Sequence, residues 1–147
     1  MTTPDIWLVA HDLTALGDAA ADEAARLCAR TGGRLLLLHV HPQADLNVPS
    51  YERTGERTFE MEKEIRAQLD NVIKSLSEKN PGLNASVEVL SGDPKERILS
   101  EADRLPARHI VVGTHNRKGL RRAVLGSVAE AVVHAAAVPV LVVKGAG

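Results

Sequence analysis

The stretch IWLVAHDLTALGDAAADEAARLCARTGGRLLLLHV, residues 6–40, decides the fold class. Its two ends, residues 6–10 and 34–40, are continuous apolar runs typical of strands buried on both faces. Between them Thr14 offers an N-cap, and apolar side chains recur at helical spacing until Gly32 ends the pattern. The stretch therefore predicts a strand, a helix and a second strand, as in a parallel sheet with helical crossovers.

The same alternation continues along the rest of the chain. We expect further helices over about 55–79, from Pro94 to about Leu105, and over 127–137. We expect further strands over 85–90, 109–113 and 138–144, the first of them at a sheet edge because its residues alternate in polarity. The sequence thus predicts one α/β domain over residues 1–147, with an open, five-stranded, mostly parallel sheet and helices on both of its faces.

Local signals refine three of these helices. The helix over 55–79 has a stripe at period 3.6 that we expect to face the core, formed by Met61, Ile65, Leu69, Val72 and Leu76. Asp93 precedes Pro94 and is predicted to cap the next helix. Cys28 lies beside Leu27 on the inner stripe of the first helix, so we expect an inert core thiol there.

Composition excludes several classes of function. The chain has 147 residues, 44% hydrophobic and 25% charged, as expected of a single globular domain. A formal net charge of −1 and an aromatic content of 2% argue against nucleic-acid partners and base-stacking platforms. No apolar run is long enough to span a bilayer and no signal peptide is recognisable, so we expect a cytoplasmic protein without a membrane partner.

Topology locates a candidate site before any motif is considered. In an open parallel sheet, ligands bind at the carboxyl ends of strands near the switch point in strand order. Three short segments occupy such ends: Ala10-His11-Asp12, Val40-His41 and Gly113-Thr114-His115. We therefore expect these segments to border one site.

The segment GTHNRKGLRRAVLGS, residues 113–127, carries the parts of a phosphate site. Gly113 permits a close backbone approach at a strand end, and Gly126 and Ser127 open a helix whose N-terminus favours an anion. Four basic side chains raise the local positive potential: Arg117, Lys118, Arg121 and Arg122. A second interpretation stays open, in which Ser127 and Glu130 form only a capping box and the basic residues only a solvated face.

Two common nucleotide motifs are absent. The turn after the first strand reads AHDLTALGD, residues 10–18, without a G-x-G-x-x-G fingerprint. A Walker A loop is excluded as well, because Lys118 precedes Gly119, the reverse of the required Gly-Lys pair. The sequence therefore argues against dinucleotide oxidoreductases and P-loop nucleotidases.

The spacing of residues 113–127 resembles the G-x2-G-x9-G-[ST] signature of the universal stress protein family. Gly113, Asn116, Gly126 and Ser127 fall on it without a gap. LVAHDLT, LLLLHV and HAAAVPVLVVK also resemble family segments, so the likeness extends over the whole chain. The resemblance implies a Rossmann-like fold of the adenine nucleotide alpha hydrolase-like type with strand order 3-2-1-4-5. It also implies a homodimer formed through the last strand, Val138 to Lys144.

The resemblance further implies an ATP site, with Mg²⁺ carried on the nucleotide. Ala10, Asp12 and Val40 would lie against the adenine or ribose. The phosphates would be held by Gly113, Asn116, Gly126, Ser127 and Val128. No residue is predicted to be catalytic, because no strong general base is recognisable near a γ-phosphate, so we expect at most slow hydrolysis. The function implied is a nucleotide-dependent stress or signalling module.

Asn116 departs from the ATP-binding pattern, which has glycine there. Asparagine tolerates a positive φ well, and its amide could donate to a phosphate oxygen. If the phosphate must touch the Cα, the same side chain would block it. We expect Asn116→Gly to bind ATP at least as tightly. The alternative function is a protein–protein interaction module of the same fold without nucleotide.

Three other interpretations are weaker. His39 and His41 share a strand face and His11 and His115 follow neighbouring strands, but no cysteine or carboxylate cluster joins them, so we predict no metal site. Asp12, His115 and Ser127 do not form a predicted triad, because Ser127 lacks a G-x-S-x-G elbow. A receiver-like arrangement would use Asp12, Asp93, Thr114 and Lys144, yet Asp93 is better explained as a helix cap.

Overall fold

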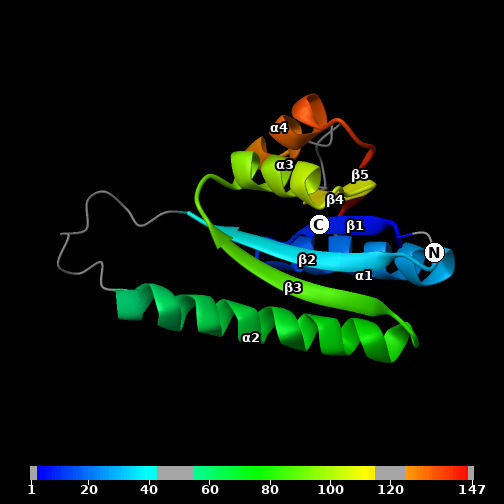
Figure 1. Ribbon diagram of the computed structural model, residues 1–147, viewed down its shortest axis with the longest axis horizontal. Coiled ribbons are helices and arrows are strands. Elements are labelled where there is room, and N and C mark those ends of the chain that lie inside the picture. The colour runs from blue at the N-terminus through cyan, green and yellow to red at the C-terminus, as the bar shows by residue number, and fades with distance from the viewer. Residues whose placement is uncertain (1–2, 43–54, 115–124, 146–147) are drawn as a thin grey trace.

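The computed structural model describes residues 3–42, 55–114 and 125–145 of the chain (Figure 1). Within them, strands and helices alternate as the sequence predicts. The elements are β1 (Ile6–Ala10), α1 (Ala15–Thr31), β2 (Arg34–His41), α2 (Gly55–Lys79), β3 (Asn84–Ser91), α3 (Pro94–Arg104), β4 (His109–Thr114), α4 (Ser127–Ala135) and β5 (Val140–Lys144). The five strands form one parallel sheet in the order β3-β2-β1-β4-β5, which confirms the predicted fold class and strand order.

Helices cover both faces of the sheet, with α1 and α2 on one side and α3 and α4 on the other (Figure 1). Strand residues alternate between two buried clusters. Val9 and Leu37 pack toward α1 and α2. Leu8, Leu36 and Ile110 pack toward α3 and α4. The central strands are apolar on both faces because both faces are covered.

Helix α1 packs on the sheet through small side chains. Ala20, Ala24 and Cys28 have no exposed surface, which lets the helix lie close to β1 and β4. The predicted signals at both ends are confirmed: the Thr14 hydroxyl accepts from the N–H of Leu16, and Gly32 has a left-handed φ of 75°. Burial raises the pKa of the Cys28 thiol to about 11, as expected of an inert core cysteine.

One local prediction, for Met61, is wrong, and one open interpretation, the Ser127 cap, is not borne out. Met61 is 42% exposed, so the buried stripe of α2 consists of Ile65, Leu69 and Leu76, with Val72 half-buried. Ser127 does not cap α4, because Gly126 is the N-cap and no side chain bonds to the first turn. The Ser127–Glu130 capping box therefore does not form; Ser127 is instead the first helical residue.

The last helix and strand are also shorter than predicted. Helix α4 ends at Ala135 and β5 begins at Val140. Pro139 explains the gap, since a residue before proline favours an extended backbone and proline has no N–H for the ladder. The carbonyl of Pro139 still accepts from Ile110 N–H at 3.0 Å. No helix of the described segments has the length and apolarity needed to cross a membrane.

Candidate functional site

A cavity of about 390 Å³ opens at the carboxyl ends of β1, β2 and β4. It lies where the strand order reverses, because β1 is flanked by β2 on one side and β4 on the other. Parallel sheets bind ligands at this point, and the volume is within the usual range for small-molecule sites. The cavity is therefore the candidate functional site.

Most residues predicted from the sequence line this cavity. They are Ala10, Asp12, Val40, Gly113, Gly126, Ser127 and Val128. Asn116, His115 and the four basic residues Arg117, Lys118, Arg121 and Arg122 lie outside the described residues. Of the strand-end residues, His41 does not line the cavity, whereas His11, His39 and Thr114 do. The cavity thus lies at the edge of the sheet where the strand order predicts a ligand site.

Asp12 organises the turn between β1 and α1. Its Oδ1 accepts from the Thr14 hydroxyl at 2.6 Å, from Thr14 N–H at 3.0 Å and from Gly17 N–H at 3.2 Å. Burial alone would raise the pKa of Asp12, but these hydrogen bonds and the nearby His11 lower it overall. No described residue donates to Oδ2, so only one of the two carboxylate oxygens holds the turn.

Leu13 gives this turn its shape. Its φ of 65° is the only positive φ among the described non-glycine residues. A leucine in this region is strained, so its surroundings must hold it there. The N–H of Leu13 donates to His11 Nδ1 at 2.9 Å, and its side chain packs against the α1–α2 cluster. No glycine or asparagine at this position signals the turn in the sequence.

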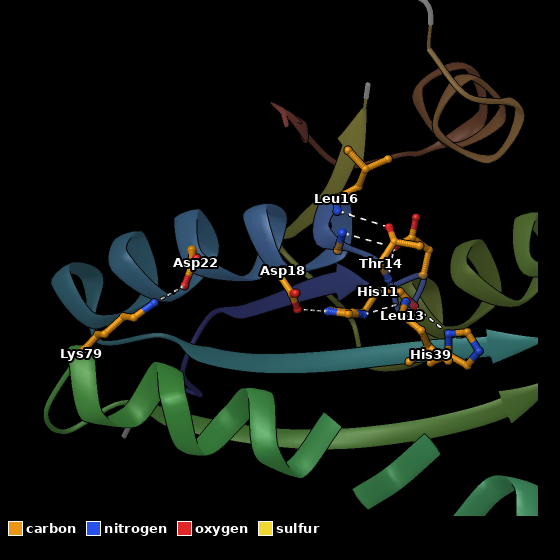
Figure 2. A network of polar contacts seen from close by, with 10 residues as sticks. His11, Leu13, Thr14, Leu16, Asp18, Asp22, His39 and Lys79 are labelled. Carbon is orange, nitrogen blue, oxygen red and sulfur yellow. Dashed lines mark hydrogen bonds and ion pairs between the residues drawn. The ribbon is translucent and has the colours of Figure 1, made fainter. Parts of the chain in front are cut away.

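The bonds of His11 define its tautomer. Nδ1 accepts from a backbone N–H, so it carries no proton, and Nε2 must carry the ring hydrogen. Nε2 then donates to Asp18 Oδ1 at 2.9 Å (Figure 2). His11 is only 5% exposed, and both of its ring nitrogens are held by hydrogen bonds.

His39 and His41 lie farther along the same face, as predicted, but have different partners. His39 Nδ1 is 2.7 Å from the carbonyl oxygen of His11, and His41 Nε2 is 3.2 Å from Glu62 Oε1. Burial lowers the pKa of His39, which favours its neutral form. Among the described residues, no group of three or more histidine, cysteine or carboxylate side chains could hold a metal ion.

Two glycines are required by contacts between α1 and the sheet. A Cβ on Gly17 would lie 2.7 Å from His11 Nδ1, and one on Gly113 would lie 2.5 Å from the carbonyl oxygen of Leu16. Real Cβ atoms do not approach other heavy atoms so closely, and the interior is too densely packed to yield freely. Gly113 thus lets the first turn of α1 pack against the end of β4.

Gly126 has a different environment. A Cβ on it would meet no described atom within 4 Å, and its φ of −64° and ψ of 161° suit any residue. The first helical bond runs from Glu130 N–H to Gly126 carbonyl, so the N–H groups of residues 127–129 have no helical partner. They lie at the positive end of the α4 dipole, on a segment that lines the cavity, and this arrangement favours an anion.

Several residues that line the cavity were not predicted from the sequence. Leu16 and Gly17 of α1 line it, and Pro94 and Ile98 of α3 line it from the other face of the sheet. Gly17 had a usable signal, because an isolated glycine inside a helical pattern often marks close packing. Pro94 and Ile98 had none, since their role depends on how α3 lies over β2.

Sequence comparison gives a consistent family likeness. Residues 5–144 match the model of the universal stress protein family. Universal stress protein YxiE of Bacillus subtilis is 31% identical, over 93% of this chain and 97% of that protein. Universal stress protein MJ0531 of Methanocaldococcus jannaschii is 39% identical, over 63% of this chain and 54% of that protein. The chain thus spans about half the length of some curated relatives it matches.

Solved structures share the fold. UspA from Lactobacillus plantarum superposes with a TM-score of 0.79 at 22% identity, covering 97% of this chain and 99% of that one. A universal stress protein in complex with cAMP gives 0.67 at 20% identity, covering 99% and 100%. One from Archaeoglobus fulgidus in complex with dAMP gives 0.65 at 22% identity, covering 97% and 98%. At these identities the likeness concerns the fold.

Proposed function

Because the chain belongs to the universal stress protein family, we propose that its strand-end cavity binds ATP together with Mg²⁺. The observation that carries this proposal is that the uncapped N-terminus of α4 and the Asp12 carboxylate border the same cavity. One end of the cavity thus suits an anion and the other suits hydroxyl donors. A nucleoside phosphate has both groups.

We propose the direction of the ligand from the order of the strands in the sheet. Phosphates would lie against residues 126–128 beyond β4, with Ser127 as a hydroxyl ligand. Ribose would lie over Asp12 at the end of β1, and the base near Val40 on β2. Gly113, and Asn116 in the adjoining segment, would complete the phosphate end. The cAMP and dAMP complexes support an adenine nucleotide because those proteins share this fold.

Mg²⁺ would reach the site on the phosphates. Among the described residues no carboxylate cluster could hold the ion by itself, and Mg²⁺ commonly keeps water and phosphate ligands. We propose a cytoplasmic nucleotide-dependent stress or signalling module with little or no hydrolysis. The alternative is a nucleotide-free interaction module, which would keep the cavity without using it.

Calorimetric titration of nucleotide-free protein with Mg-ATP tests the proposal directly. We expect saturable heat at one site per chain, with Kd in the micromolar range, equivalent to about 8 kcal/mol of binding free energy. Protein shown to be free of nucleotide that gives neither heat nor a thermal shift would favour the alternative function.

Asp12→Asn separates ligand contact from helix capping. Asparagine keeps an acceptor for the Thr14 and Gly17 donors, so stability should change by less than about 1 kcal/mol. It replaces the free carboxylate oxygen with an amide, and ATP affinity should fall about tenfold. The readouts are urea unfolding and calorimetric titration.

Thr14→Ala is the matched control, because it removes a cap but leaves Asp12 Oδ2 intact. It should lower stability by about 1 kcal/mol and change ATP affinity much less. Equal affinity losses in the two variants would show that Asp12 acts only through the turn.

We further propose that two chains pair through β5 into a homodimer. This strand lies at the sheet edge, and the side chains of residues 140–143 are only half-buried. An apolar edge strand invites pairing, and a second copy would give a two-fold interface.

Val142→Pro tests the dimer. Gly145 N–H donates to Thr114 and Pro139 carbonyl accepts from Ile110, so in a parallel ladder the N–H of Val142 faces away from β4. Proline there should block edge pairing and halve the mass measured by light scattering, with a native circular dichroism spectrum. A monomeric wild-type chain at the same concentration would contradict the proposal.

A further inference from the structure

Leu13 holds a strained backbone conformation directly beside a residue of the candidate site. Its φ of 65° is unfavourable for leucine, and Asp12, the residue before it, borders the cavity. A residue held in this region returns to ordinary backbone angles unless its surroundings prevent it. Since a change at Leu13 would alter the path of the turn, it would also move the Asp12 carboxylate. The position of Asp12 therefore depends on what holds Leu13.

The imidazole ring of His11 holds Leu13 through its backbone. His11 Nδ1 accepts from Leu13 N–H at 2.9 Å, and His11 Nε2 donates to Asp18 Oδ1 at 2.9 Å. Figure 2 shows the ring between Asp18 and the turn that contains Leu13. The Asp18 carboxylate accepts the ring hydrogen on Nε2, so the lone pair of Nδ1 is left for Leu13 N–H. Asp18 thus selects the tautomer that can hold the turn.

The His11 ring is itself fixed by close contacts. It is only 5% exposed, and a Cβ on Gly17 would lie 2.7 Å from its Nδ1. The ring therefore packs directly against the first turn of α1, where Gly17 N–H also donates to Asp12 Oδ1 at 3.2 Å. The backbone of His11 is held as well, because His39 Nδ1 lies 2.7 Å from its carbonyl oxygen and must donate to it. The ring cannot move away from Leu13 without disturbing these contacts.

We propose that His11 is a positioning residue, which keeps the Asp12 carboxylate in place for a ligand by holding Leu13 in its left-handed conformation. Both ring nitrogens are bonded to protein groups, so His11 has no polar ring atom left for the ligand itself. Its influence on binding must therefore pass through Asp12. The inference rests on the proposed nucleotide site and adds a residue on which the affinity of that site depends.

Two amide substitutions separate the roles of the ring nitrogens. In His11→Asn the amide oxygen lies near the place of Nδ1 and can accept from Leu13 N–H, whereas in His11→Gln the amide lies near the place of Nε2. Titration of nucleotide-free protein with Mg-ATP should give an affinity within about threefold of wild type for His11→Asn and a loss of about tenfold for His11→Gln. His134→Gln is the control, because this histidine is exposed and does not line the cavity. Urea unfolding checks that each titrated variant is folded.

Double-mutant cycles test the route through the turn. If His11 acts through Asp12, His11→Gln should cost less than about threefold in ATP affinity when Asp12→Asn is already present. Glycine adopts a positive φ without strain, so His11→Gln should also cost less than about threefold in a Leu13→Gly background. A residue that contacted the nucleotide directly would lower the affinity equally in all three backgrounds.

An exposed substitution tests the same bond without disturbing the buried ring. Asp18→Ala removes the acceptor of His11 Nε2, so the ring hydrogen can move to Nδ1 and oppose Leu13 N–H. ATP affinity should then fall about threefold. Asp22→Ala is the matched control, because it removes another exposed carboxylate of α1, one that pairs with Lys79. It should leave ATP affinity unchanged.

The outcomes separate the two proposals. The role of His11 would be overturned, and the nucleotide site kept, by wild-type affinity in folded His11→Gln or by equal losses in His11→Asn and His11→Gln. A full loss for His11→Gln in the Asp12→Asn background would overturn it as well. If the His11 variants do not fold, wild-type affinity in Asp18→Ala would overturn it instead. Wild-type protein that is free of nucleotide and does not bind Mg-ATP would overturn the proposed function and this inference together.

Discussion

Gly126→Val is expected to abolish detectable ATP binding while changing the stability of the fold by less than about 1 kcal/mol. A Cβ at this position meets no described protein atom within 4 Å, and the backbone conformation suits valine. The added methyl groups would instead occupy the space before the free N–H groups of α4. Glycine is needed at this position only if a ligand occupies that space. The substitution should therefore abolish ATP affinity and leave the free energy of unfolding nearly unchanged.

Ala137→Val is the matched control for this substitution. It adds the same side chain at an exposed position after the opposite end of α4, and ATP should bind as it does to wild type. Calorimetric titration and urea unfolding of the three proteins give the comparison. Unchanged ATP affinity in Gly126→Val would show that no phosphate lies against this helix end.

Gly113→Ala should have the opposite effect, a large loss of stability. Its Cβ would lie 2.5 Å from the carbonyl oxygen and 3.0 Å from the carbonyl carbon of Leu16, which belong to the backbone of α1. Backbone atoms cannot rotate away, so α1 or β4 must shift. We expect a loss of about 3 kcal/mol, and a melting temperature lower by roughly 10 °C.

Gly126→Ala is the control here, because it adds the same methyl group where there is room. Its urea midpoint should match wild type. A wild-type midpoint for Gly113→Ala would mean that α1 moves away at little cost, and the close contact would then not explain the glycine. Together, Gly113→Ala and Gly126→Val test whether the first glycine of the 113–127 motif is needed for the fold and the later one for the ligand.

The sequence alone determined the element order, the parallel sheet and the edge of the sheet at which a site forms. These follow from short-range patterns: apolar runs of strand length, helical periodicity and cap residues such as Thr14 and Asp93, both of which bond as caps. The burial expected of Met61 was wrong because helical periodicity does not show where a helix extends beyond the core. The Ser127 cap did not form because the capping-box pattern does not prevent Gly126 from being the N-cap. A local sequence pattern predicts structure reliably where that structure depends only on neighbouring residues of the same segment.

Only the tertiary structure decided how the cavity is built. The positive φ of Leu13, the tautomers of His11 and His39, and the contact between Gly113 and Leu16 all depend on groups brought together from different elements. His11 and His39 are 28 residues apart in sequence, yet one carbonyl oxygen of the first orients the ring of the second. Periodic sequence patterns show which face of a helix or strand is buried. The direction of a histidine lone pair depends instead on contacts between strands, because packing at those contacts fixes the orientation of the imidazole ring.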